Sequence, residues 1–286
     1  MNQDAADTQA RPVLDTAPDG RLGIIPLKST QEIGRKVNDY LVEWRNSRVK
    51  KGLVGGENGY ARDSFIIQAD TPRFGSGEAM GSIAESVRGD DLYILVDVCN
   101  YSLTYQIGGF SNAMSPDDHF QDLKRVIAAA GRKAHRINVI MPYLYEGRQM
   151  KRTGRESLDC ANALQELTSM GVENIISFDA HDARVMNAVP LAGFETVSPS
   201  YQFIKSILRH EEGLVIDSAH MMSVSPDEGG MSRAIYIANV LGIDMGMFYK
   251  RRDYTTLIDG ANPIVAHEFL GTEVEDRFCG VSGVVC

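Results

Sequence analysis

The feature that most constrains the fold is a strand–loop–helix–strand succession in the middle of the chain. An apolar run, Ile137–Met141, closes at Pro142, and a helical pattern of apolar residues follows over Leu158–Met170 before a second apolar run, Asn174–Asp179. Two strands joined by a crossover helix pair side by side in the same direction. The succession therefore predicts an α/β fold with a parallel sheet.

The same pattern returns after Ser198, which predicts a second α/β domain. It gives a helix over 201–209, a strand over 221–224, a helix over 231–241 and a strand over 245–249. Residues 1–20, rich in Asp, Ala, Gln and Pro, are typical of a disordered arm. We therefore expect an arm at 1–20, a first domain at 21–197 and a second at 198–286.

Two helix starts and two further strands are indicated in the first domain. Ser29 with Glu32 predicts a capping box that opens a helix running to about Arg45. Ser115-Pro116-Asp117-Asp118 combines a cap, a proline and two acids, and Gly131 ends the helix. Short apolar runs at 22–27 and 64–69 predict the strands.

Composition limits the partners. The net charge of −9 argues against nucleic-acid binding, although basic clusters remain candidate anion sites. The longest apolar run is too short for a membrane span, so we expect no membrane partner. The four cysteines (Cys99, Cys160, Cys279 and Cys286) are far apart and are typical of reduced thiols in a cytoplasmic protein.

Charged residues follow the two central strands. Asp179 and His181 would point the same way if strand alternation persisted, and could then hold a divalent cation or share a proton. An Asp that caps the next helix beside a satisfied histidine is an equally good interpretation. The loop Tyr143–Arg155 carries Arg148, Lys151, Arg152 and Arg155. Because parallel strands end at one edge, we expect these cations beside the metal ligands, as in a nucleotide–magnesium site.

Three other motifs are weaker alone. Arg73–Gly81 reads R-F-G-S-G-E-A-M-G and approximates a dinucleotide fingerprint, but its spacing is wrong by one, which favours a turn. Asp227 is a candidate helix cap that could also bind a metal. Lys250-Arg251-Arg252 is either an anion site or a solvated charge run. A Rossmann dehydrogenase is unlikely, because the acid that would bind the ribose of the cofactor is missing after the following strand. The sequence also contains no P-loop motif.

Five segments in order resemble ribose-phosphate pyrophosphokinases, the phosphoribosyl pyrophosphate synthetase family. Their sequences are R-F-G-S-G-E followed by E-S-V-R-G-D-D-L-Y-I-L, then P-Y-L-Y-E-G-R-Q-M-K-R, F-D-A-H, S-P-D-E-G-G-M-S-R-A and Y-K-R-R-D. Together they extend from about Leu22 to Arg252. The resemblance implies two phosphoribosyltransferase-like α/β domains with parallel sheets flanked by helices, the second one incomplete.

The resemblance also implies the reaction and its residues. The family transfers diphosphate from Mg²⁺-bound ATP to ribose 5-phosphate, and its members are homo-oligomers built on dimers and reaching hexamers. By motif, the ATP contacts would be Phe74, Ser76, Gly77, Glu78, Arg148, Gln149 and Arg152. The metal ligands would be His181, Asp227 and Asp179. Lys250 would be the catalytic lysine, with Arg252 contacting the sugar phosphate or the transition state.

The chain departs from the family pattern in places. Ser76 stands where an Asp or Asn is usual, and Met150 replaces an acid. Segments 48–63 and 101–115 are longer than in compact members. After Glu275 the family's acidic, Thr/Gly-rich sugar-phosphate loop is missing. The alternative function is therefore a truncated, non-catalytic homologue that binds nucleotide or regulates a full-length synthetase.

Overall fold

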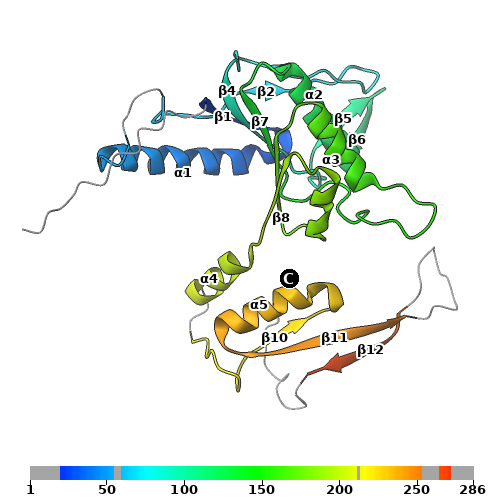
Figure 1. Ribbon diagram of the computed structural model, residues 1–286. Coiled ribbons are helices and arrows are strands. Elements are labelled where there is room, and N and C mark those ends of the chain that lie inside the picture. The colour runs from blue at the N-terminus through cyan, green and yellow to red at the C-terminus, as the bar shows by residue number, and fades with distance from the viewer. Residues whose placement is uncertain (1–19, 55–58, 211–212, 253–263, 272–286) are drawn as a thin grey trace, which may run out of the picture. The chain divides into compact units, whose positions relative to one another are not determined.

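The computed structural model describes residues 20–54, 59–210, 213–252 and 264–271. The chain divides into two compact units, Met1–Val197 and Ser198–Cys286. Each unit combines a sheet with helices (Figure 1), so the predicted α/β class with parallel sheets flanked by helices is confirmed. The expected arm, apart from Gly20, and the tail Asp276–Cys286 lie outside the described residues.

A five-stranded parallel sheet organises the first unit. The spatial order of its strands is β1-β4-β7-β8-β9. The prediction that β7 and β8 are parallel neighbours is therefore confirmed. The elements of this unit are β1 (Arg21–Pro26), η1 (Lys28–Thr30), α1 (Gln31–Lys50), β2 (Ala69–Asp70), β3 (Ser82–Ile83), β4 (Asp90–Leu95), β5 (Thr104–Ile107), β6 (Phe110–Ala113), α2 (Pro116–Ala130), β7 (Arg136–Ile140), α3 (Asp159–Ser169), β8 (Asn174–Phe178), η2 (Ala183–Ala188) and β9 (Gly193–Val197).

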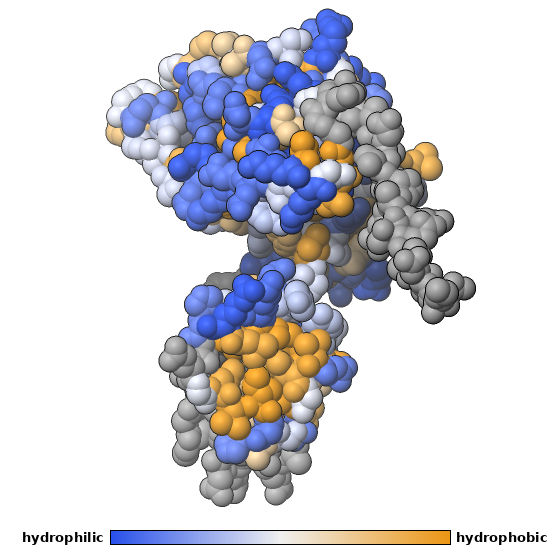
Figure 2. Space-filling model, turned by 90° about the vertical axis from the view of Figure 1, so that its left-hand side faces the viewer, coloured by the Kyte–Doolittle hydropathy of each residue, from blue (hydrophilic) through white to orange (hydrophobic). Residues whose placement is uncertain are grey.

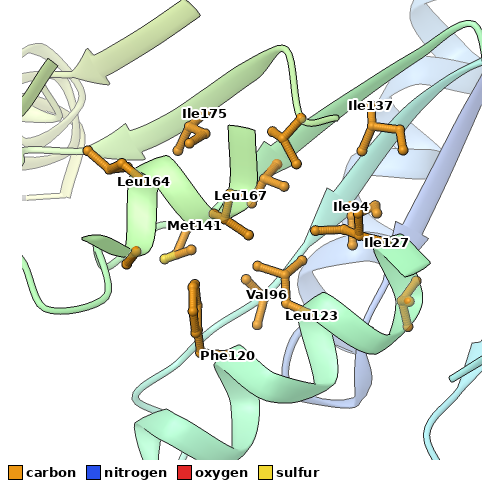
Figure 3. Packing of buried hydrophobic residues seen from close by; sticks show 14 of the residues in the cluster. Ile94, Val96, Phe120, Leu123, Ile127, Ile137, Met141, Leu164, Leu167 and Ile175 are labelled. Atoms are coloured by element: carbon orange, nitrogen blue, oxygen red, sulfur yellow. The ribbon is translucent and has the colours of Figure 1, made fainter. Parts of the chain in front are cut away.

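Alternation along the strands gives this sheet two buried faces. In β4, Ile94 belongs to the larger apolar cluster, which includes the stripe that α2 and α3 present to the sheet (Figure 3). The next residue, Leu95, belongs to a smaller cluster with Ile24 and Phe65, against which α1 packs. Successive side chains of a strand point to opposite faces, so the helices form one layer on each side of the sheet. The core fixes the strand ends that carry the candidate site.

The predicted start of α2 is confirmed. The Ser115 hydroxyl accepts the Asp118 N–H while the Asp118 carboxylate accepts the Ser115 N–H, and Pro116 occupies the first turn. Gly131 ends the helix in the left-handed conformation at φ 57°. A reciprocal cap of this kind satisfies two backbone donors that the first helical turn leaves open.

The capping box predicted for Ser29 is wrong. α1 begins after Thr30, which makes no side-chain cap. The Ser29 hydroxyl instead accepts the Asp97 N–H at 3.0 Å, and Thr30 Oγ1 donates to the Leu95 carbonyl at 2.8 Å. Both hydroxyls are engaged by the end of β4, because tertiary contacts there replace the local cap.

The strand predicted over 64–69 forms only in part. Ile66 makes a single parallel bridge to Ile24 of β1, and Ala69 begins the two-residue strand β2. The bonds between the Ile24 N–H and the Phe65 carbonyl, and between the Ile67 N–H and the Ile24 carbonyl, close the edge of β1. Beyond Ile67 the chain leaves β1, and Ala69 and Asp70 pair with β3 instead.

The second unit holds a three-stranded sheet in the order β10-β11-β12. β10 and β11 are parallel, as predicted, whereas β12 runs antiparallel to β11 and was not predicted. The elements are α4 (Ser200–His210), β10 (Met222–Ser225), η3 (Glu228–Gly230), α5 (Met231–Leu241), β11 (Asp244–Arg252) and β12 (Ile264–Leu270).

α5 buries only part of its apolar surface. Ala234 and Ala238 are buried, whereas the larger side chains of Met231, Ile235, Tyr236 and Val240 are 37–48% exposed. Figure 2 shows hydrophobic residues gathered on one face of this unit. Faces of this kind are typical of surfaces that another part of a protein or a partner covers. None of the helices in the described part of the chain has both the length and the apolar character needed to span a bilayer.

Candidate functional site

The carboxyl ends of β4, β7 and β8 lie along one edge of the first sheet, because these strands are parallel neighbours. The loop after β4 is held tightly at this edge. Asp97 accepts the Cys99 N–H at 2.9 Å, the Asn100 amide donates to the Ser29 carbonyl at 3.0 Å, and buried His119 lies 2.8 Å from the Asn100 carbonyl. These bonds fix the conformation of the loop after β4 at this edge of the sheet.

The loop after β7 is the basic loop, Tyr143–Arg155. Tyr145 anchors its start by stacking on Phe120 at 4.2 Å and donating to Asp117 at 2.6 Å. Gln149 donates its side-chain N–H to the Ser157 carbonyl at 2.8 Å. Gln149, a predicted ATP contact, therefore braces the loop in this structure.

The cations of the basic loop face solvent without acidic partners. Among the residues that the structure describes, Arg148, Lys151, Arg152 and Arg155 make no ion pair, and all four side chains are exposed. Unpaired guanidinium and ammonium groups at a fixed edge are suited to phosphate oxygens, since an anion gains charge-assisted hydrogen bonds there. Arg148 and Arg152 were predicted as ATP contacts.

Arg148 lies close to the loop after β4. Burial and the nearby Asp97 carboxylate raise the pKa of the Cys99 thiol, while a hydrogen bond from Tyr101 and the charge of Arg148 oppose this rise. The charge of Arg148 likewise opposes the rise in the pKa of exposed Tyr101, which the neighbouring Cys99 causes. The structure thus brings the basic loop and the end of β4 together at one place.

The end of β8 differs from the prediction. β8 stops at Phe178, and Asp179 adopts a left-handed backbone with φ 49°, so the alternation that would align Asp179 with His181 does not continue. Asp179 and His181 are both exposed. Asp182 is the residue that caps the following η2, and the hydrogen bonds it accepts from Arg184 lower its pKa to about 2.

The candidate metal ligands can be compared with what magnesium requires. Within the described residues no group of three or more His, Cys, Asp or Glu side chains is gathered for a metal. Mg²⁺ bound to a nucleotide takes one or two carboxylates and completes its octahedron with phosphate oxygens and water. The exposed Asp179 carboxylate at the end of β8 is a ligand of the kind that this requirement calls for.

The segment Arg73–Gly81, here called the glycine turn, is a tight turn as predicted from its residues. The Phe74 N–H donates to the Glu78 carbonyl at 2.7 Å and the Gly77 N–H to the Phe74 carbonyl at 2.9 Å. Gly77 has φ 90°, a conformation that glycine adopts without strain. Phe74 is 53% exposed, and the Ser76 hydroxyl donates to Glu78 at 2.9 Å. Among the described residues, no hydrogen bond or ion pair joins this turn to Arg148 or His181.

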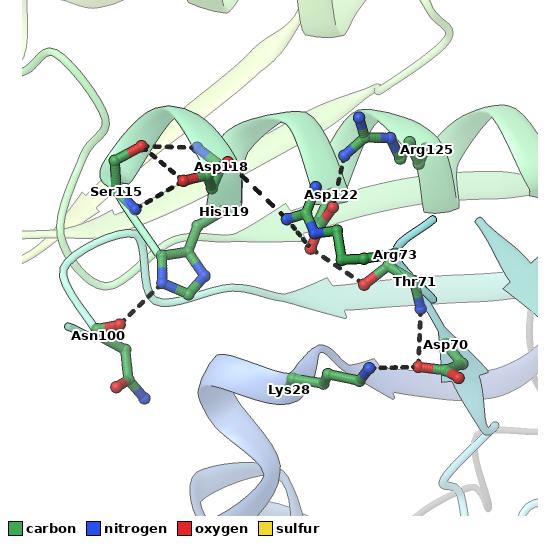
Figure 4. Close-up of polar contacts among 10 residues, drawn as sticks. All are labelled: Lys28, Asp70, Thr71, Arg73, Asn100, Ser115, Asp118, His119, Asp122 and Arg125. Atoms are coloured by element: carbon green, nitrogen blue, oxygen red, sulfur yellow. Dashed lines mark hydrogen bonds and ion pairs between the residues drawn. The ribbon is translucent and has the colours of Figure 1, made fainter. Parts of the chain in front are cut away.

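Contacts with α2 hold the base of the glycine turn (Figure 4). Arg73 forms an ion pair with buried Asp122 at 3.1 Å, and Asp122 also accepts the Thr71 hydroxyl at 3.0 Å and Arg125 at 2.6 Å. Sequence reasoning missed Asp122, although an acid beside the buried stripe of α2 with an arginine three residues later is a readable signal.

In the second unit, Asp227 caps η3 by accepting the Gly230 N–H at 3.2 Å. The Ser225 hydroxyl donates to the Asp227 carbonyl at 2.6 Å, which fixes the turn between β10 and η3. The cap interpretation of Asp227 is therefore confirmed, and its role towards a metal stays a prediction. The backbones of Lys250 and Arg252 lie at the end of β11, and their side chains lie outside the described residues.

Comparisons with known proteins agree on one family. Residues 22–171, more than half of the chain, match the model for the N-terminal domain of ribose phosphate pyrophosphokinase. The ribose-phosphate pyrophosphokinase of Maricaulis maris is 26% identical over 226 residues, covering 78% of this chain and 64% of that protein. That of Pasteurella multocida is 30% identical over 187 residues, covering 64% and 53%.

A solved structure shows the same fold. The crystal structure of phosphoribosylpyrophosphate synthetase from Mycobacterium smegmatis is similar with a TM-score of 0.60 and 20% identity. The match covers 86% of this chain and 67% of that one. The chain spans 64% of the length of the Maricaulis maris relative and 53% of that of the Pasteurella multocida relative.

Proposed function

Because this chain belongs to the ribose-phosphate pyrophosphokinase family, we propose that it transfers diphosphate from Mg²⁺-bound ATP to ribose 5-phosphate. The 1-hydroxyl of the sugar attacks the β-phosphorus, the bond from that phosphorus to the α-phosphate oxygen breaks, and phosphoribosyl pyrophosphate and AMP result. The observation that carries the proposal is the basic loop, which follows the carboxyl end of β7 and whose four cations make no ion pair within the described residues.

The basic loop suits the electrostatic demand of this transfer. Phosphoryl transfer spreads negative charge over the oxygens of the moving group, so most of the catalysis comes from positioned positive charge. Arg148 is the leading contact, because it is exposed, lacks an ion pair within the described residues and lies close to the firmly held loop after β4. Arg152 would bind a more distal phosphate oxygen.

A magnesium ion would be held by Asp179 and His181 at the end of β8. The role of Asp227 towards a metal rests on the family resemblance alone. When bound, the ion would neutralise the β- and γ-phosphate oxygens and polarise the phosphorus for attack. The left-handed turn at Asp179 gives that carboxylate a direction different from the rest of β8. Asp227 holds its own loop after β10 by accepting the Gly230 N–H.

The remaining roles rest on the family resemblance. Lys250 would stabilise the moving phosphoryl group and Arg252 the sugar phosphate or the transition state, both at the end of β11. Phe74, Ser76, Gly77 and Glu78 would hold adenine, with the exposed Phe74 ring stacking on the base.

We propose that the glycine turn serves a second copy of the chain, in a homo-oligomer built on dimers. The turn makes no hydrogen bond or ion pair with the basic loop within the described residues, and the exposed apolar residues of α5 offer surface for assembly. The widely spaced cysteines support a cytoplasmic location.

An assay for AMP release tests the function. The protein is incubated with Mg²⁺-bound ATP, with and without ribose 5-phosphate, and AMP is quantified. Sugar-dependent AMP release is the expected result. ATP binding without sugar-dependent release would instead support the alternative, a non-catalytic homologue that binds nucleotide or regulates a full-length synthetase. Absence of ATP binding would refute the assignment of the basic loop.

A further inference from the structure

The glycine turn has little internal support of its own. Two backbone hydrogen bonds, among Phe74, Gly77 and Glu78, cross its tip, and a single antiparallel bridge between Arg73 and Ala79 closes its base. The Phe74, Ser76 and Glu78 side chains are exposed, and a hydrogen bond from the Ser76 hydroxyl to the Glu78 carboxylate joins the last two. The position of these side chains must therefore be set by whatever holds the turn from outside.

α2 holds one side of the turn. The Arg73 side chain is only 12% exposed, and its guanidinium donates to Asp122, whose carboxylate is 9% exposed. Asp122 is fully engaged, since it also accepts from Thr71 and Arg125. At the exit of the turn, Gly81 lies so close to the Arg125 carbonyl that a Cβ there would overlap it. A largely desolvated ion pair of this kind resists displacement of either partner.

The β5–β6 hairpin holds the opposite side. The Arg73 guanidinium lies 4.8 Å from the centre of the Tyr105 ring, a cation–π contact. A Cβ built on Gly77 would lie 2.8 Å from the Ile107 Cδ1 and 3.9 Å from the Tyr105 ring. The tip of the turn therefore packs directly on the hairpin, while Arg73 is enclosed by Tyr105 and Asp122.

Nothing in the proposed chemistry uses the hairpin. Its register pairs Thr104 with Ala113 and Ile107 with Phe110, and Gly108-Gly109 form its bend with φ 55° and 88°. Phe110, opposite Ile107, is 77% exposed. The two residues of the Ile107–Phe110 pair thus differ sharply: Ile107 lies against Gly77, whereas Phe110 is largely exposed to solvent.

We propose that Arg73, Asp122, Tyr105 and Ile107 are positioning residues that clamp the glycine turn in one conformation and thereby set the affinity for ATP. The part of this inference that concerns ATP rests on the proposed function, whereas the clamp itself rests on the geometry alone. None of the four contacts the reacting phosphates in the proposal. Loss of the clamp therefore raises the KM for ATP and leaves kcat nearly unchanged, because the entropy lost on ordering the turn then opposes ATP binding and not the chemical step.

Two hairpin variants test the clamp without breaking the Arg73–Asp122 pair. Tyr105→Ala removes the ring beneath Arg73, and Ile107→Ala removes the methyl groups beneath Gly77. Tyr105→Phe keeps the ring and serves as the conservative variant, and Phe110→Ala serves as the matched control on the same hairpin. The first readout is hydrogen exchange of the Phe74 and Gly77 amides in the full chain without nucleotide. The second is the KM and kcat for ATP in the AMP-release assay.

We expect Tyr105→Ala and Ile107→Ala to speed exchange at both amides, and to raise the KM for ATP, by roughly 2- to 30-fold. Tyr105→Phe and Phe110→Ala should match the unaltered protein. Unchanged exchange in both alanine variants would overturn the clamp, and so would a loss confined to kcat. If the unaltered protein binds no ATP, the proposed function fails, and the exchange rates alone then decide whether the clamp exists.

Discussion

Replacing Arg148 with alanine gives the sharpest test of the basic loop. Within the described residues, exposed Arg148 makes no ion pair or side-chain hydrogen bond, so its removal breaks no such bond of the fold. Surface changes of this kind alter the free energy of unfolding by no more than about 0.5 kcal/mol. Any loss of ATP binding would then come from the missing contact itself.

The size of that loss follows from the interaction removed. A hydrogen bond to a charged group contributes about 1.5–3 kcal/mol, which corresponds to roughly 10- to 160-fold in the dissociation constant. We expect calorimetric titration of Mg²⁺-bound ATP to show a loss within this range. Arg155→Ala is the matched control, because Arg155 is an exposed cation of the same loop that carries no assigned role.

The comparison between the two variants also addresses bulk electrostatics. A general fall in positive charge would weaken ATP binding equally in Arg148→Ala and Arg155→Ala, and would fade at high salt. A contact at Arg148 predicts a loss in that variant which persists at high salt. Equal affinities in all three proteins would refute the placement of phosphates at Arg148.

Three further predictions concern the scaffold. Asp91→Asn should lower stability above pH 4 and flatten the pH dependence of stability, because burial opposes ionisation of Asp91 but hydrogen bonds from Arg136 and Asn138 outweigh it and lower the pKa of Asp91. The stabilisation by Asp91 is therefore present above the unfolded pKa of about 3.9 and is lost as the pH falls through the lower folded pKa. In urea titrations, a difference in stability between wild type and variant that stays constant from pH 7 to pH 2 would contradict this. Ser115→Ala should cost about 1 kcal/mol by removing the cap of α2, measured as a lower urea midpoint at unchanged slope. Leu123→Ala, at a fully buried position, should cost about 2–5 kcal/mol, and a thermal midpoint within a degree of the unaltered protein would show that the site is not packed as described.

Local patterns allowed much of the fold to be predicted from the sequence. The α2 boundaries followed from Ser115 and Gly131, whose roles depend only on neighbouring backbone. The parallel pairing of β7 and β8 followed from a connection rule that allows few alternatives. Such features are fixed within a short stretch of chain, so one sequence is enough to recognise them.

Features decided by distant contacts were not predictable in the same way. Ser29 has the local sequence pattern of a helix cap, yet its hydroxyl accepts a hydrogen bond from the backbone N–H of Asp97, 68 residues away. The left-handed turn at Asp179 coincides with bonds from the Asp179 and Ala180 amides to Val197 and Thr196 of β9. The β5–β6 hairpin is the exception, because Gly108-Gly109 between alternating residues is a hairpin signal that could have been recognised.

The candidate site divides along the same line. The basic loop was predictable, because it needs only a strand that ends before a run of cations. The bonds that hold it, from Tyr145 to Asp117 and from Gln149 to Ser157, depend on the way α2 and the loop pack. Sequence reasoning therefore identified charges that could bind phosphate, and the structure supplied the supports that position them.

The order of strands in the first sheet has a consequence for how the chain is made. The strands are added across the sheet in the same order as along the chain, β1, β4, β7, β8 and β9. A chain emerging from the ribosome can therefore complete each pair as soon as its second strand appears, without leaving a gap for a later segment to enter. By the time β7 has emerged, three adjacent strands and both α1 and α2 are available. During synthesis, each new strand of this unit can thus pair at the same edge of the sheet that is already formed.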